Sequence, residues 1–282
     1  MELSLQLAAT ALLAALYAAG LVRVRRHGRT VAAARVAAFG LAVAVLVAAF
    51  ASPLERLGEE RLFSAHMAQH LLLGDLAPLL VVLGLDGPVL RPLLAVRAVR
   101  RLRVLAHPLV ALPLWALNLC AWHVTPLYDA ALDHDAVHAL QHGLFFTCGV
   151  LLWSALLEPL PGPAWFTAGR KVLYVGGMWP VSLALSQVFL WSGHAYYARY
   201  VHAPRTWGLG PLADQRAGGG VMLVEGTLVM LGVLVWLLLR AFRESETRER
   251  LLDAGVEPEA AARAARYGRT GAWPPHGRVT KT

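Results

Sequence analysis

Seven stretches of the chain are almost entirely apolar, and each is long enough to cross a lipid bilayer. A helix needs about 20 apolar residues to span about 30 Å of hydrocarbon. The stretches lie near residues 3–22, 31–51, 65–85, 107–125, 136–157, 172–194 and 218–239. Runs such as residues 41–49 do not alternate between apolar and polar side chains, which argues against a membrane β-barrel. The pattern predicts an all-α, polytopic membrane protein with seven transmembrane helices.

Composition supports this class and divides the chain into two parts. The 282 residues are 57% hydrophobic and 16% charged, which is more apolar surface than one soluble core can bury. Glu2 stands where a signal peptide would carry basic residues, and no small-x-small cleavage site follows, so we expect the first segment to be retained. Residues 1–240 are expected to form the transmembrane domain. Residues 241–282 are expected to form a cytoplasmic tail, helical and then disordered beyond Tyr267.

The distribution of basic residues predicts the orientation. Eleven lysine and arginine residues lie in the loops after segments 1, 3 and 5, against five in the loops on the opposite side. The positive-inside rule therefore places the N-terminus outside and the C-terminus in the cytoplasm. The net charge of +8 suits cytoplasmic loops beside anionic lipid, and we do not expect nucleic acid to be a partner.

The pattern HxxQH occurs twice inside the apolar segments, at residues 66–70 and 138–142. A polar ring is costly in lipid unless it has a partner. The i, i+4 spacing places both imidazoles of a pair on one helix face, about 6 Å apart, where they can share one cation. A single histidine in a membrane helix more often donates a hydrogen bond to a neighbouring helix. Two such pairs at one depth instead predict a metal site.

The predicted topology brings further metal-ligating side chains to the same outer end. His123 closes the fourth segment and His194 the sixth, and Cys120 precedes His123 by three residues. Met222 and Glu225 lie three residues apart near the outer end of the seventh segment. Imidazole with sulfur suits Cu(I), whereas imidazole with carboxylate also suits zinc or iron. The predicted metal ligands are His66, His70, His123, His138, His142, His194, Met222, Glu225 and Cys120.

The two histidine pairs also suggest an internal repeat. The interval from His66 to His123 is 57 residues and that from His138 to His194 is 56. Each interval begins with HxxQH and has a tryptophan shortly before its closing histidine. Segments 3–4 and 5–6 are therefore candidates for a duplicated helical hairpin, and parallel repeats often share a site at their interface.

Four stretches of sequence around these residues resemble the CtaG-like cytochrome c oxidase assembly factors of bacterial membranes. They are HMAQHLLL at 66–73, WHVTPLYDAAL at 122–132, HALQH at 138–142, and a stretch at 214–222 with Asp214, Gln215, Gly218, Gly219 and Met222. The resemblance implies a multi-pass protein of the bacterial plasma membrane that helps to mature a haem–copper oxidase by supplying copper. It implies as partners an oxidase subunit and a copper donor protein on the outer side. The family tends to have glutamate where Gln141 stands, and residues 223–225 also depart from its pattern.

Three functions remain open on the sequence. In the first, the protein is a metallochaperone rather than an enzyme, and the outer histidines accept copper and release it by ligand exchange, with Met222 or Cys120 as soft ligands. In the second, His70 and His142 on facing helices ligate a b-type haem for electron transfer. In the third, three histidines hold zinc and a carboxylate acts as base in an intramembrane hydrolase. The candidate bases are Glu225, Asp214 and Asp75.

Overall fold

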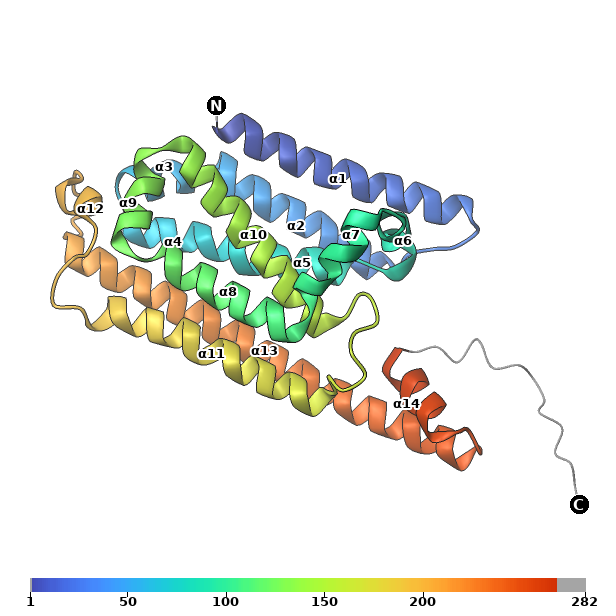
Figure 1. Cartoon of the computed structure of the whole chain (residues 1–282). Helices are drawn as coiled ribbons and strands as arrows, with labels where there is room; N and C mark the ends of the chain where they lie inside the picture. The colour runs from blue at the N-terminus through green and yellow to red at the C-terminus, as the bar shows by residue number, and fades with distance from the viewer. Residues whose placement is uncertain (1, 268–282) are drawn as a thin grey trace, which may run out of the picture.

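The computed structural model is a bundle of helices and describes residues 2–267, among which there is no β-strand (Figure 1). The α-helices are α1 (Glu2–Arg26), α2 (Ala33–Ala51), α3 (Pro53–Glu60), α4 (Phe63–Leu71), α5 (Ala77–Gly84), α6 (Gly87–Ala95), α7 (Arg97–Leu102), α8 (Pro108–Trp122), α9 (Thr125–Asp133), α10 (Asp135–Leu157), α11 (Ala168–Trp191), α12 (Ala198–His202), α13 (Pro211–Asp253) and α14 (Pro258–Tyr267). A π-helix, η1 (Leu72–Leu76), joins α4 to α5, and a 3-10 helix, η2 (Arg103–Ala106), precedes α8.

Six helical stretches in the described part of the chain are long and apolar enough to cross a membrane: α1, α2, Phe63–Gly84, α10, α11 and α13. The predicted span at 107–125 corresponds to α8, which has only 15 residues. It meets the segment Arg97–Ala106 at a bend of 76°, and the bent pair provides the seventh span if it is counted as one. Pro108 lies in the first turn of α8, where its missing N–H removes no hydrogen bond of the helix. The predicted all-α, multi-pass architecture is confirmed, and its orientation stays a prediction.

The two ends of the bundle differ in chemistry. Figure 1 shows the start of α1 beside α3 and α9 at one end, which we call the α3 end, whereas α6 and α7 lie toward the other. The α7 region carries Arg97, Arg100 and Arg101, and the α3 end carries the acidic helix α3 and the starts of α4 and α10. Both HxxQH motifs therefore lie toward the α3 end, away from the arginine-rich segment.

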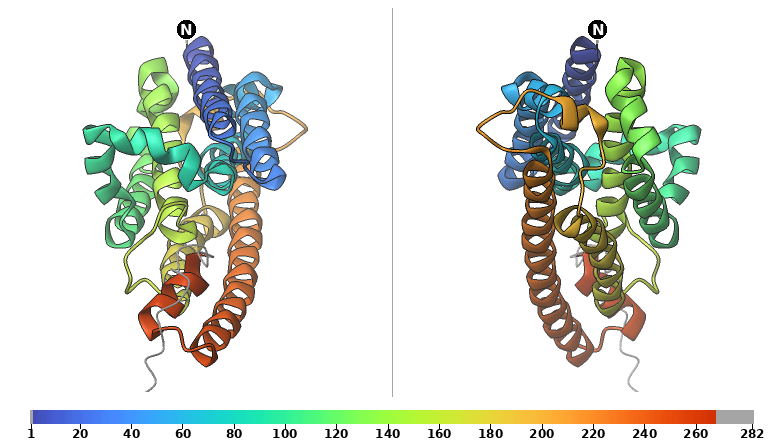
Figure 2. Two further views of the ribbon diagram at one scale, coloured as in Figure 1. Left: turned by 90° about the vertical axis from the view of Figure 1, so that its right-hand side faces the viewer. Right: turned by 90° about the vertical axis from the view of Figure 1, so that its left-hand side faces the viewer.

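The tail is attached to the bundle through its last described helix. Helix α13 is 43 residues long and continues without a break through residue 240, where the sequence predicted a boundary. Figure 2 shows α14 folded back beside the end of α13. Arg266 of α14 forms an ion pair with Glu158 at the end of α10, and Lys171 Nζ lies 3.0 Å from the same carboxylate. The residues predicted to be disordered beyond Tyr267 lie outside the described part.

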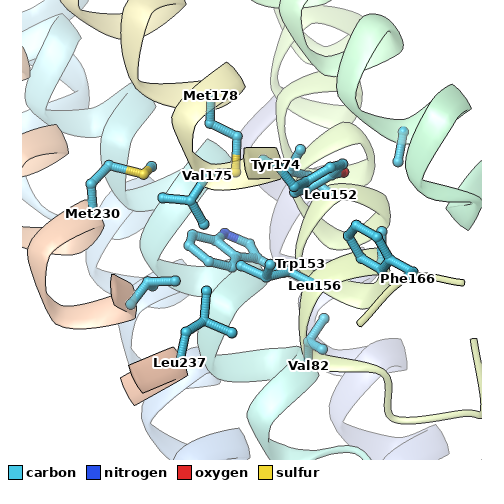
Figure 3. Close-up of a cluster of buried hydrophobic side chains, with 13 residues drawn as sticks. Val82, Leu152, Trp153, Leu156, Phe166, Tyr174, Val175, Met178, Met230 and Leu237 are labelled. Carbon is cyan, nitrogen blue, oxygen red and sulfur yellow. The ribbon is translucent and has the colours of Figure 1, made fainter. Parts of the chain in front are cut away.

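The largest apolar cluster of the core surrounds Trp153 of α10, toward the arginine-rich side of the histidines. Figure 3 shows Trp153 packed among Val175 and Met178 of α11 and Leu237 of α13. The indole is fully buried, and its Nε1 donates a hydrogen bond to Asp75 Oδ1 at 2.9 Å. Helix α10 is therefore held both by apolar packing and by a polar contact to η1.

Gly149 of α10 lies against the π-helix that follows the first histidine pair. A Cβ atom at this position would be 2.2 Å from the carbonyl oxygen of Gly74, a distance that no side chain could occupy. His142 precedes Gly149 by about two helical turns, and His70 precedes Gly74 by about one turn. The close approach of the two backbones therefore brings the second histidine pair beside the first.

Candidate metal centre

The two HxxQH pairs face each other across α4 and α10. Within each pair, His66 with His70 and His138 with His142, the ring centroids are 4.1 Å apart. Between the pairs, His66 lies 5.5 Å from His138, and His70 lies 5.5 Å from His142. His123, at the C-terminal cap of α8, adds a fifth ring at 6.3 Å from His70. We call these five residues the histidine cluster.

Three members of the cluster lie close enough together that one ion could bind to all of them. His66, His70 and His138 each offer a ring nitrogen, and these nitrogens all lie within 4.8 Å of one another. The three residues, which we call the histidine triad, are 0%, 5% and 2% exposed. An ion bound to imidazole lies about 2.0–2.1 Å from each nitrogen. Small side-chain movements would therefore convert the triad into a three-coordinate site.

The buried ring nitrogens have unused bonding capacity. Neither nitrogen of His66 or of His70 has a hydrogen-bond partner among residues 2–267. In His123, His138 and His142, Nε2 is the nitrogen without a partner. A buried polar atom left unpaired costs about 1–3 kcal/mol. A bound metal ion would remove this cost, so the cluster fits the chemistry of a metal site.

Two of the rings are oriented by acceptors outside the cluster. Nδ1 of His138 lies 3.1 Å from Glu2 Oε1 and 3.0 Å from Glu59 Oε1, and Nδ1 of His123 lies 2.7 Å from the carbonyl oxygen of Leu119. A neutral ring that donates from Nδ1 keeps its Nε2 lone pair for a metal. Histidines that bind metals almost always have such an acceptor behind them.

Met222 and Glu225 lie next to the cluster rather than within it. Both line a cavity of about 50 Å³ whose walls also include His70, His123 and Met67. The cavity has room for one or two water molecules. Met67 is absent from the predicted ligand set, although its position three residues before His70 puts both side chains on one side of α4. The cavity therefore places two thioether sulfurs beside two imidazoles.

Two predicted ligands are not brought to the cluster. Cys120 is exposed on α8. His194 is also exposed, in the segment after α11, and its ring faces Tyr196 with a centroid distance of 4.8 Å. Its carbonyl oxygen accepts a hydrogen bond from Gln215 Nε2 at 3.0 Å. The closing histidines of the two intervals, His123 and His194, therefore have different surroundings, and the duplicated hairpin stays a prediction.

Asp214 of α13 positions the helix that carries the first histidine pair. Its carboxylate accepts hydrogen bonds from the backbone N–H of Phe63 at 2.6 Å and of Ser64 at 3.2 Å, at the start of α4. A carboxylate there also interacts favourably with the helix dipole. Asp214 is 2% exposed, so these hydrogen bonds are shielded from water. It acts as the N-terminal cap of α4, which has no capping side chain of its own.

The sequence matches one protein family over most of its length. Residues 15–244 match the model of the cytochrome c oxidase caa3 assembly factors. The chain belongs to this family. The resemblance carried by the histidine motifs is thereby confirmed, and family membership together with the apolar helices makes this a multi-pass membrane protein.

Relatives of this family member occur in mycobacteria. An uncharacterized protein of Mycobacterium bovis and one of Mycobacterium tuberculosis are each 28% identical to it over 262 residues. One of Mycobacterium leprae is 26% identical over 247 residues. The matches cover 84%, 84% and 81% of this chain but only 38%, 38% and 37% of the relatives, so the chain spans well under half of their length. No solved structure matches the sequence significantly.

Proposed function

We propose that the protein binds copper at its histidine cluster and supports copper insertion into a haem–copper oxidase. Family membership supplies the role in oxidase assembly. The observation that carries the copper proposal is the histidine triad, whose ring nitrogens lie within 4.8 Å of one another and are buried. Copper is cargo in this proposal, so the site must both bind it and release it.

Imidazole ligands suit this task. Neutral imidazoles bind copper in either oxidation state, and an ion held by three of them can leave as single ligands are exchanged. The sulfurs of Met67 and Met222, in the cavity beside His70, offer soft ligands that favour Cu(I). The triad can therefore act as the receiving site and the adjacent cavity as the next position along the path.

The two other functions have less support. A haem group needs a pocket of several hundred Å³, whereas the cavity beside His70 and His123 has about 50 Å³. A zinc hydrolase needs a carboxylate that is available as a base. Asp214 is occupied as the cap of α4, and Asp75 accepts a hydrogen bond from Trp153. Of the three predicted bases only Glu225 remains for that role, and it lies in the small cavity rather than at the triad.

The location of the site fits delivery from outside the cell. The positive-inside rule directs the arginine-rich segment to the cytoplasm, so the α3 end faces outward. In this orientation a copper donor protein on the outer side would reach the cluster, and an oxidase subunit in the same membrane would receive the ion.

A complementation experiment tests the proposal. Cells that lack the protein would be supplied with the wild type, the H66A/H70A variant or the H194A variant. The copper-to-haem ratio of the purified oxidase would then be measured. We expect a full ratio with the wild type and H194A, and a depleted ratio with H66A/H70A. A full ratio with H66A/H70A, expressed at the wild-type level, would contradict the proposal.

A further inference from the structure

A second group of potential metal ligands lies at the surface of the α3 end. Oxygen atoms of Glu2, Glu55 and Glu59 all lie within 4.8 Å of one another. They line a cavity of about 440 Å³ between the start of α1, helix α3 and the start of α10. The other charged residues of its wall are Glu60, Asp135, Arg56 and Arg199. We call Glu2, Glu55 and Glu59 the carboxylate group.

These carboxylates repel one another, and a cation would relieve the repulsion. Their oxygens lie within 4.8 Å of one another, so the like charges repel, and each side chain is half-buried, which further disfavours its charged form. A divalent ion bound by the three oxygens would offset both effects. Hard oxygen ligands of this kind bind divalent cations in general and select weakly among them.

The carboxylate group is connected to the buried triad by shared residues. Glu2 also forms a group with His138 and His142, whose ligand atoms again lie within 4.8 Å of one another. His138 in turn belongs to the triad with His66 and His70. Three overlapping groups therefore lead from the surface cavity to the buried rings, and each neighbouring pair of groups has one residue in common.

The buried histidines give evidence that is independent of the acidic residues. His138 is 2% exposed, and its Nδ1 faces Glu2 and Glu59 while its Nε2 has no partner in the described structure. Behind it, His66 is fully buried and both of its ring nitrogens lack partners within that part of the chain. The carboxylates therefore adjoin a set of unsatisfied ligands, unlike an ordinary acidic patch on a surface.

We propose that Glu2, Glu55 and Glu59 form a capture site for a divalent transition-metal ion, which then passes to the histidine triad by ligand exchange. The proposal rests on the proposed function because the triad is the destination of the ion. At each step one residue keeps the ion while others are replaced, first Glu2 and then His138. Nδ1 of His138 gives its proton to water when it binds the ion, and it takes a proton back once Nε2 has bound the ion within the triad. No electron transfer is needed. The carboxylates attract the dication from water, and the imidazoles, which bind copper more tightly than oxygen ligands do, retain it.

A kinetic experiment on the full chain in detergent tests the capture site. Cu²⁺ would be mixed rapidly with the protein, and quenching of tryptophan fluorescence would report loading. Glu55→Gln is the informative variant because, within residues 2–267, the ion pairs of His138 and His142 are with Glu2 and Glu59 and not with Glu55. Glu60→Gln removes a charge from the same cavity but not from the group. We expect E55Q to load at least about tenfold more slowly with its final copper affinity within about twofold of wild type, and E60Q to load at nearly the wild-type rate. Equal loading rates for E55Q and E60Q would overturn the proposal.

A second measurement separates failure of the capture site from failure of the proposed function. In the H66A/H70A background, Mn²⁺ binding would be followed by the loss of the free-ion electron paramagnetic resonance signal. We expect one weakly bound Mn²⁺ in this background and in H66A/H70A/E60Q, and none in H66A/H70A/E55Q. Identical Mn²⁺ isotherms for the two triple variants would overturn the capture site. Tight copper binding by H66A/H70A would overturn the proposed function. The Mn²⁺ comparison would still show whether Glu55 belongs to a cation site, because both triple variants already lack the triad. Melting temperatures would confirm that each variant is folded.

Discussion

Nδ1 of His138 lies 3.0 Å from Oε1 of Glu59, and this contact joins the short helix α3 to the long helix α10. Glu2 approaches the same nitrogen from α1 at 3.1 Å. Two carboxylates from different helices therefore hold one imidazole through Nδ1, which would leave the lone pair of Nε2 for the proposed metal ion. The contacts of Glu2 and Glu59 with His138 therefore connect the surface of the α3 end to the buried triad.

Replacing Glu59 with glutamine should weaken copper binding at the triad. The amide is a weaker acceptor than the carboxylate, so it stabilises the Nδ1–H form of His138 less. Loss of such a partner typically costs 10–100-fold in metal affinity, and we expect E59Q to lie in this range. Copper titration against a competing chelator would measure it, with E60Q as the control. An affinity of E59Q equal to that of E60Q would show that Glu59 does not support the site.

Gly149→Ala should destabilise the bundle. The added methyl group would overlap the carbonyl oxygen of Gly74, so α10 and η1 must separate. Overpacking of this kind costs about 1–3 kcal/mol. Gly143→Ala, on the same helix with nothing within 4 Å of its Cβ, is the matched control and should be neutral or slightly stabilising. Thermal unfolding in detergent would compare the two, and a melting temperature of G149A at or above that of G143A would contradict the close contact.

Asp214→Ala should also destabilise the protein, because it removes the cap of α4. Loss of an N-cap lowers the free energy of unfolding by about 0.5–2 kcal/mol. Because the hydrogen bonds of Asp214 are buried and its carboxylate is charged, we expect its loss to fall near the upper end of this range. The control is Asp133→Ala, since Asp133 is 62% exposed and its ion pair within the described residues is a long one, with Arg199 at 3.6 Å. We expect a clear fall in melting temperature for D214A and almost none for D133A. Equal stability of the two variants would exclude a capping role.

Partial burial and the nearby charges of Glu59 and Glu2 raise the pKa of Glu55 to about 7, which predicts how stability depends on pH without metal. The folded protein holds this proton up to about pH 7, whereas the unfolded chain releases it near its ordinary value of 4.5. The stability that the proton contributes is therefore complete below about pH 4.5 and is lost as the pH rises through about 7. With a chelator present, the melting temperature of the wild type relative to E55Q should fall between pH 5 and 7 and then level off. A constant or rising difference would contradict the raised pKa.

The sequence was sufficient to predict the parts of the site that depend on local periodicity. The apolar runs predicted the long helices, and the i, i+4 spacing predicted that His66 would lie beside His70 and His138 beside His142. Residues of one pair are neighbours within a single helix, so their closeness does not depend on how the helices pack against one another. The confirmed family resemblance rests on the same motifs.

Other features depend on contacts between distant residues. Asp214 caps a helix that begins about 150 residues earlier, which no local pattern indicates. The position of His194 is set by the loop after α11 and its bond to Gln215, so depth in the membrane alone was a poor guide to its neighbours. The acidic helix α3 lay in a predicted loop, and only the fold brings Glu59 to His138.

Equilibrium copper titration of the purified protein tests whether His66 and His70 hold copper. The wild type, H66A/H70A and H194A would be titrated with copper in competition with a chelator of known affinity. We expect tight binding by the wild type and H194A, because His194 lies apart from the cluster, and at least a hundredfold loss in H66A/H70A, equivalent to about 2.7 kcal/mol. Unchanged copper affinity in H66A/H70A would show that the triad is not the copper site.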